Sequence, residues 1–390
     1  MQNIVRFPDK AAGFVPARLA EARIARQVSR ADVARELGLS GQAVGYYETG
    51  ERRPDMAMLL RLAGVLEHPV AFFLREASPL DGRCGARFYR SVGPKSNKVN
   101  QALDVKTKWL WEIVNYLQRY VRLPTPNLPN VPDPKDEVFS PEEIEEVATL
   151  ARRHWGLGDG PIANMVALLE THGLIVSRFE TGATGIDAFS TRIEGRPYVV
   201  LGSDKGSCAR SRFDAAHELG HLLMHAAISQ EDLQTSQVRD RIEREANLFA
   251  GAFLLPRSSL LAEFYSTRLS HLQGLKQRWR VSMQAIAHRC KQVGAIDPDQ
   301  YILFRKQISA RKWLKREPLD DEIPLEQAKL LLKAWQLLLE KGVVSEASFD
   351  EEVGFSLEFV ERLSGRIPAP KPREEGPNVR LLRVHRDNDA

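Results

Sequence analysis

The residues best suited to chemistry stand close together in the run AAHELGHLLMH, which covers positions 215–225. His217 and His221 are four residues apart, so on a helix both imidazoles project from one face and can bind a single Zn²⁺. Glu218 is placed to take a proton from a water molecule that the metal activates. We expect a helix over 208–226 to carry these side chains. The alternative is a degenerate site on a helix that serves only as a scaffold or sensor.

A zinc site of this kind needs a third ligand, and the helix expected near 238–254 offers two carboxylates. Glu243 and Glu245 point about 200° apart, at about 100° per residue, so they cannot both face one metal ion. We favour Glu243, which lies four residues before Asn247. We expect His225 to lie on the solvent side or behind the ligands rather than to be an alternative ligand one turn on.

A second pattern, SRADVARELGLSGQAVGYYETGERRP, covers positions 29–54. It predicts a helix that starts after Ser29, a tight turn at Gly38 and a second helix from Ser40, while Asp55 is placed to start a third. In such a helix-turn-helix the second helix enters the DNA major groove. The candidates for base contact are Ser40, Gln42, Ala43 and Tyr46, and those for phosphate contact are Arg30, Arg52 and Arg53. A helical bundle that only mediates protein contacts is the alternative.

Residues 16–76 resemble the XRE, or lambda-repressor-like, helix-turn-helix family. The resemblance rests on Ala34, Leu37–Ser40, Val44, Tyr47–Gly50 and Pro54. Gly41 and Gly45 depart from the family, which usually has larger polar residues there. Because glycine weakens a helix and offers no side chain to a base, we expect modest sequence preference.

Residues 140–256 resemble the ImmA/IrrE family of zinc metallopeptidases, whose metal site is similar to that of thermolysin-type enzymes. The residues that carry the resemblance are Phe213, Ala216–His221, His225, Glu243, Ala246–Asn247, Phe249–Ala250 and Leu254–Pro256. It implies that His217, His221 and Glu243 bind Zn²⁺ and that Glu218 is the catalytic base. Tyr198 and Tyr265 are candidates to stabilise the oxyanion.

The two resemblances together imply a DNA-binding regulator that is also a zinc-dependent metalloendopeptidase. Its expected protein substrate is an XRE-type repressor, cut in response to DNA damage or phage infection so that mobile-element or antiphage genes are switched on. Its DNA partner is a duplex operator or single-stranded DNA. The rival function is a non-enzymatic XRE repressor or antitoxin with a peptidase-like sensor domain. A homodimer is left open.

Composition and charge fit such a protein. Three cysteines far apart in 390 residues are no disulfide framework, and the start of the chain has no secretory signal, so we expect a cytoplasmic location. No apolar run is long enough for a bilayer, so no membrane partner is expected. Residues 1–123 hold 20 Lys/Arg and 12 Asp/Glu, which gives a net charge of +8 and indicates nucleic-acid binding. Much of this charge lies in a basic extension: Arg83, Arg87, Arg90, Lys95, Lys98, Lys106 and Lys108.

The expected fold is mostly α-helical with a small β-sheet, in an α+β arrangement. Three short strands are predicted in the runs GLIVSRFE, GIDAFSTRI and RPYVVLG. The expected parts are a helix-turn-helix domain (1–78), a basic connector with a helix and an extended Pro-rich linker (79–137), a zincin-like metallopeptidase domain (138–300), a C-terminal helical, sensor-like region (301–365) and a flexible tail (366–390). We expect 279–294 to pack within the peptidase rather than to form a second nucleic-acid contact.

Cys84 stands in the connector, in the run GRCGARF, and is similar to the cysteine switch of matrix metalloproteinase propeptides in the three residues Arg-Cys-Gly. A thiolate is a good zinc ligand, so Cys84 could occupy the open metal position and keep the peptidase latent. The alternative is an incidental thiol. Cys208 is a rival near the start of the metal-binding helix, and Cys290 is expected in the core.

Overall fold

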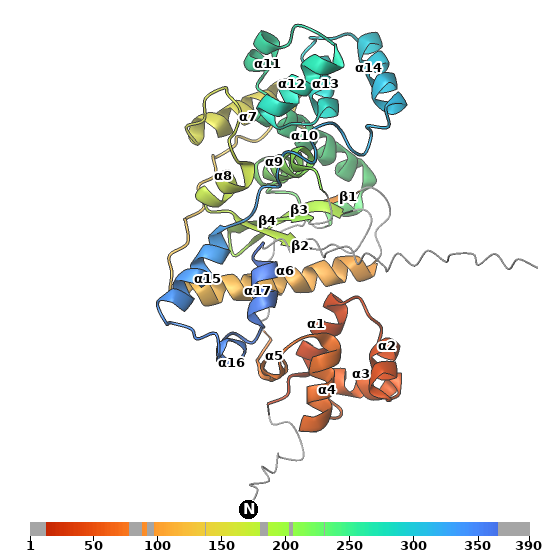
Figure 1. The fold of residues 1–390 in the computed structure, drawn as a ribbon, viewed down its shortest axis with the longest axis vertical. Helices are drawn as coiled ribbons and strands as arrows, with labels where there is room; N and C mark the ends of the chain where they lie inside the picture. The colour runs from red at the N-terminus through yellow and green to blue at the C-terminus, as the bar shows by residue number, and fades with distance from the viewer. Residues whose placement is uncertain are drawn as a thin grey trace, which may run out of the picture.

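The computed structural model describes residues 13–77, 88–91, 97–136, 138–179, 186–202, 206–229 and 231–365. Within these ranges the chain is mostly helical with one small four-stranded sheet, which confirms the expected fold class. Figure 1 shows the helix-turn-helix at one end, the sheet in the middle and a group of short helices at the other end. No helix in these ranges is long and apolar enough to cross a bilayer.

Five short helices form the N-terminal part: α1 (Pro16–Ala25), α2 (Arg30–Leu37), α3 (Gly41–Thr49), α4 (Met56–Leu66) and α5 (Val70–Leu74). The side chains of Ser29, Ser40 and Asp55 each cap a helix by accepting the backbone N–H three residues on, as predicted. Gly38 ends α2 with a φ of 68°, a backbone conformation that glycine adopts without steric cost. The chain therefore turns sharply from α2 into α3.

The sheet contains β1 (Phe88–Ser91), β2 (Ile175–Phe179), β3 (Ile186–Ile193) and β4 (Arg196–Gly202), in the order β1-β3-β4-β2. The last three are the predicted strands. β4 pairs parallel with β2 and antiparallel with β3. β1, which the sequence did not predict, comes from the connector and pairs antiparallel with the outer edge of β3, so that Phe88 lies opposite Ser190.

Helices cover both faces of the sheet (Figure 1). One face packs against α8 (Met165–Thr171) and α9 (Cys208–Met224), while α10 (Ser236–Leu254) packs on α9 and α7 (Pro141–His154) packs on α10. The other face shares a core with α6 (Asn97–Gln118), α15 (Leu330–Glu340) and α17 (Leu357–Leu363). Side chains alternate along β4, so Val199 and Leu201 join the α9 core while Tyr198 and Val200 join the α6 core. α16 (Phe349–Val353) packs on α5.

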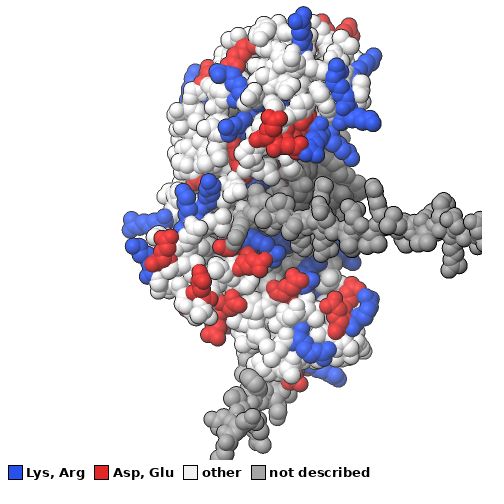
Figure 2. Space-filling view, in the orientation of Figure 1, with Lys and Arg blue, Asp and Glu red and all other residues white. Residues whose placement is uncertain are grey.

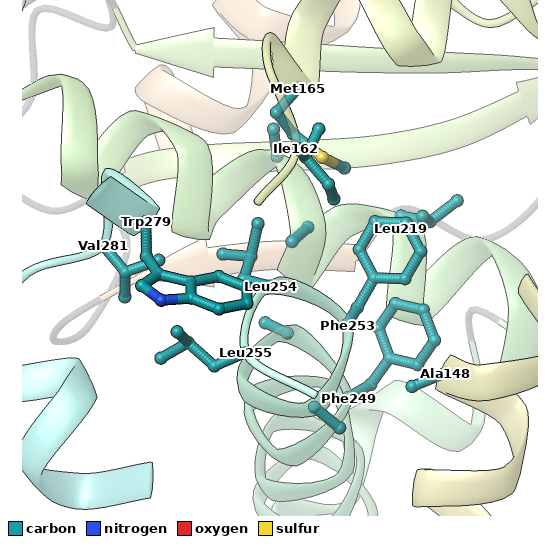
Figure 3. Packing of buried hydrophobic residues seen from close by; sticks show 14 of the residues in the cluster. Ala148, Ile162, Met165, Leu219, Phe249, Phe253, Leu254, Leu255, Trp279 and Val281 are labelled. Atoms are coloured by element: carbon teal, nitrogen blue, oxygen red, sulfur yellow. The ribbon is translucent and has the colours of Figure 1, made fainter. Parts of the chain in front are cut away.

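Four further helices extend the α9 side: α11 (Arg257–Glu263), α12 (Leu269–Trp279), α13 (Met283–Gln292) and α14 (Pro298–Ala310). A short 3-10 turn, Asp232–Gln234, precedes α10. Met283, Ile286 and Cys290 of α13 are buried in the same core as α9 and α10. This favours packing over nucleic-acid contact for 279–294. Figure 3 shows Trp279 and Val281 beside Leu254 and Leu255 at the end of α10.

A buried ionic cluster joins α1 to α6. Arg18 pairs with Glu21 and with Glu112, at 2.9 Å each. Lys108 pairs with Glu21 at 2.5 Å, and the indole N–H of Trp109 donates to the same carboxylate at 3.0 Å. Lys108 was assigned to the basic extension by sequence, but its charge is used inside the protein, because a buried carboxylate needs a cation beside it.

The Pro-rich linker forms no helix or strand over 123–134, and hydrogen bonds of its backbone hold it against the ends of α7 and α8. The backbone N–H of Asn127 donates to the carbonyl of His172 at 2.9 Å, and the Trp155 indole donates to the Asn127 carbonyl at 2.7 Å. Gly173 has a φ of 83°, and a Cβ there would come within 2.4 Å of the Thr125 backbone. Only glycine allows this close approach.

The C-terminal helices do not pack as one layer. Phe304 and Ile308 of α14 belong to the α9 core, whereas α15 to α17 belong to the core shared by the helix-turn-helix and α6. The segment between them is held by buried ion pairs. Lys276 pairs with Glu317 at 3.0 Å and with Asp320 at 2.7 Å.

Candidate metal centre

α9 carries the predicted metal motif in a fully buried position. His217, Glu218 and His221 are 0 % exposed. Gly220, in the same turn, lets α10 approach closely, because a Cβ there would lie 2.9 Å from the ring of Phe249. Figure 3 shows Phe249 stacked with Phe253 next to Leu219 of α9. The small residue in the motif thus brings the third candidate ligand within reach of the first two.

Three candidate ligand atoms converge between α9 and α10. The Nε2 atoms of His217 and His221 are 3.0 Å apart, and carboxylate oxygens of Glu243 lie 3.4 Å from the first and 3.5 Å from the second. Two ligand atoms on a tetrahedral zinc ion, with bonds of about 2.0–2.1 Å, are separated by about 3.3–3.4 Å. Two imidazoles and one carboxylate also leave a fourth position for water or substrate. The residues therefore fit a catalytic zinc ion.

The protonation of Glu243 also fits metal binding. Burial opposes its charge, but hydrogen bonds and charge from His217 and His221 outweigh burial and hold the pKa of Glu243 well below its usual value. The carboxylate is therefore ionised at neutral pH, as a metal ligand must be. The structure brings together the three residues that the sequence predicted as ligands. Glu245 instead lies 2.8 Å from Nε2 of His225.

Ser190 holds the candidate base and was missed by the sequence analysis. Its hydroxyl donates to Oε2 of Glu218 at 2.6 Å. A signal was present, because Ser190 takes the same face of β3 as the buried Ala188, where an apolar residue is expected. Tyr198, a candidate for oxyanion stabilisation, belongs to the α6 core on the opposite face of the sheet. Tyr265 is 84 % exposed.

Each candidate histidine ligand has a polar partner on its other ring nitrogen. Nδ1 of His217 lies 3.2 Å from the side-chain oxygen of Asn247, and Nδ1 of His221 lies 2.9 Å from Nδ1 of His225. His225 is 2 % exposed, and burial lowers its pKa to about 4, although the hydrogen bond that its Nε2–H donates to Glu245 acts in the opposite direction. His225 is therefore neutral at neutral pH. It lies behind the ligands, as one of the expectations had it, and not on the solvent side.

The candidate DNA contacts gather on one side of α3. Gln42 donates to the hydroxyl of Tyr46 at 2.6 Å, and the Arg52 guanidinium stacks on the Tyr46 ring at 4.9 Å. Arg53 is exposed. Arg30 lies over the neighbouring Gly45, and its side chain pairs with Glu48 at 2.7 Å.

Two other candidate DNA contacts stand at the start of α3. Ser40 and Ala43 are joined there by the helix cap. Figure 2 shows basic and acidic side chains intermixed over the helix-turn-helix end on the face in view.

Comparison with protein families gives two matches. Residues 19–73 match the family described as helix-turn-helix, and residues 169–291 match the family described as the IrrE N-terminal-like domain, which is a peptidase family. The chain joins an XRE-type helix-turn-helix to an IrrE-type peptidase domain. No curated protein matches the chain.

A pocket of about 680 Å³ lies beside Asn247 in the IrrE-type domain. Asn247, the partner of His217, forms part of its wall, and Phe213, Leu248 and Arg244 line it from α9 and α10. Ala285 contributes from α13. The pocket thus offers both apolar and charged surface beside Asn247, the partner of His217.

The structure describes two of the three cysteines, Cys208 and Cys290. Cys84 lies outside the described residues. Cys208 and Cys290 are both buried in the IrrE-type domain, and Cys290 belongs to the core, as expected. Burial raises the pKa of Cys208, and it raises the pKa of Cys290 to about 12. Both are therefore thiols rather than thiolates at neutral pH, which makes them poor metal ligands.

Proposed function

We propose that the chain is a DNA-binding regulator whose IrrE-type domain is a zinc endopeptidase. The observation that carries this is the convergence of His217, His221 and Glu243 next to Glu218, whose carboxylate is held by Ser190. His217, His221 and Glu243 would hold the ion. The proposed peptidase unit is 138–300, and its proposed substrate is an XRE-type repressor that is cut after DNA damage or phage infection.

Different residues of the site have different roles in the proposed hydrolysis. A bound zinc ion would act as a Lewis acid for the peptide carbonyl and for water. The Glu218 carboxylate accepts a proton from the attacking water and can return it to the leaving amine, while Ser190 keeps the carboxylate in place. The pocket beside Asn247 accepts a side chain of the substrate. A non-enzymatic sensor with the same fold remains the rival, and it would use none of this proton transfer.

Arg53→Ala is expected to weaken DNA binding about equally for all sequences, because a phosphate contact carries no base information. The slope of log K against log salt concentration should fall in magnitude by about 1, because one phosphate contact fewer is made. Fluorescence anisotropy with duplex and single-stranded oligonucleotides at two salt concentrations measures this. Arg305→Ala is the control, because Arg305 is on α14, which lies at the opposite end of the molecule from the helix-turn-helix in Figure 1. If the wild-type chain binds neither oligonucleotide at low salt, the proposed DNA-binding role fails.

Cys84→Ala is expected to raise basal cleavage at least about tenfold, because a thiolate in the open zinc position must leave before water can enter. The connector supports this latency. Only four residues after Cys84, Phe88 pairs with Ser190, whose hydroxyl holds Glu218. Cleavage of a repressor substrate by zinc-loaded protein without a trigger is the measurement, with Cys208→Ala as control. Equal basal rates in wild type and Cys84→Ala would end the hypothesis.

A further inference from the structure

We propose that His225 and Glu245 are a positioning pair that holds His221 with Nε2 toward the metal and thereby strengthens zinc binding. The inference rests on the proposed metal centre and assigns a task to two buried residues that hydrolysis itself does not use. Neither residue is a ligand in this assignment. They act through His221, which is their link to the ion.

The series of hydrogen bonds from His221 through His225 to Glu245 allows only one arrangement of protons when Nε2 of His221 binds the ion. Nε2 of His221 faces Nε2 of His217 and the Glu243 carboxylate, so it is the nitrogen that would bind the ion. A neutral imidazole has one N–H, which must then be on Nδ1 of His221. It donates to Nδ1 of His225 over 2.9 Å, which leaves the His225 proton on Nε2. That proton is donated to Glu245 over 2.8 Å.

A carboxylate is a suitable final acceptor for this series of hydrogen bonds. It accepts hydrogen bonds without donating any, so no alternative tautomer of His225 satisfies Glu245. The pair is also buried, with His225 2 % and Glu245 5 % exposed, so bulk water has little access to either partner. Arg241 approaches the other oxygen of Glu245 at 3.7 Å and supports its negative charge.

The two histidine ligands are therefore held differently. His217 has a neutral amide behind it, because the Asn247 side-chain N–H₂ donates to the carbonyl of Glu243 and turns its oxygen toward His217. His221 has a negative charge behind it, transmitted through His225. A carboxylate behind a histidine makes its ring a stronger electron donor to a metal. We therefore expect the outer partners of His221 to strengthen its bond to zinc more than Asn247 strengthens that of His217.

The test compares zinc affinity, by competition with a chromophoric chelator, in the full-length chain and three variants. Glu245→Gln and His225→Phe are expected to weaken zinc binding about tenfold to a hundredfold, the usual effect of an outer partner. Because the two residues act in series, the double variant should be no weaker than His225→Phe alone. Glu170→Gln is the matched control. Its carboxylate, on α8, is also buried but accepts the backbone N–H groups of Lys329 and Leu330 at the start of α15, and within the described part of the chain it makes no hydrogen bond to a candidate ligand.

A second readout follows the protons directly. ¹⁵N-histidine spectra of the zinc-loaded wild type should show His225 protonated at Nε2. Glu245→Gln should lower the population of this tautomer, whereas Glu170→Gln should leave it unchanged. If Glu245→Gln and Glu170→Gln have the same zinc affinity, the positioning pair is refuted while the metal centre stands. A wild-type chain that binds no zinc would refute the metal centre and the pair together.

Discussion

Glu218→Gln is expected to abolish peptide cleavage while zinc binding and DNA binding remain as in the wild type. Removal of a general base costs about 10²–10⁴-fold in rate, and an amide cannot take the proton from water. The variant keeps the local structure, because the Ser190 hydroxyl can donate to the amide oxygen as it donates to the carboxylate at 2.6 Å. Incubation with purified XRE-type repressors, and with a proteome-derived peptide library, measures the loss.

The same experiment separates the enzyme from its rival. Glu170→Gln, a buried Glu→Gln change on α8, controls for a general effect on folding. Cleavage by wild type and Glu170→Gln but not by Glu218→Gln supports the peptidase. If the zinc-loaded wild type cuts neither the repressors nor any library peptide, the non-enzymatic sensor is the better account. Undiminished cleavage by Glu218→Gln would remove Glu218 from the mechanism.

His217→Ala is expected to reduce the zinc content of the purified protein from about one ion per chain to almost none. Two ligands on neighbouring helices cannot close a tetrahedral site that normally needs three from the protein. Elemental analysis after removal of loosely bound metal gives the stoichiometry. His172→Ala, which removes a histidine stacked on Trp155, should leave the content unchanged.

The choice between the two carboxylates of α10 is tested in the same way. Glu243→Gln should weaken zinc binding more than Glu245→Gln, because only Glu243 lies within 3.5 Å of both ligand nitrogens. The reverse order would mean that Glu245 is the ligand. Metal-free wild-type protein from zinc-rich medium would contradict the metal centre as a whole.

The helix-turn-helix was the most predictable part of the fold. Ser29, Gly38 and Ser40 act through the backbone within three residues of themselves, so their effects do not depend on the rest of the chain. The spacing of His217 and His221 was equally informative, because one helix places both side chains on one face. The structure of the connector was predicted less well from the sequence. β1 forms only because β3 offers it an edge, and the basic residue Lys108 pairs with Glu21, a residue 87 positions away.

The sequence by itself determined the two families, the order of the parts and the two candidate histidine ligands, since these depend on local patterns and on residue types at fixed spacing. Only the tertiary structure decided which carboxylate of α10 meets the histidines and what each remaining polar group does. Ser190 reaches Glu218 across 28 positions, and Glu245 reaches His225 across 20. Such pairs are set by how α9 packs on the sheet and on α10. A buried polar group must find its partner in whatever element the core places beside it.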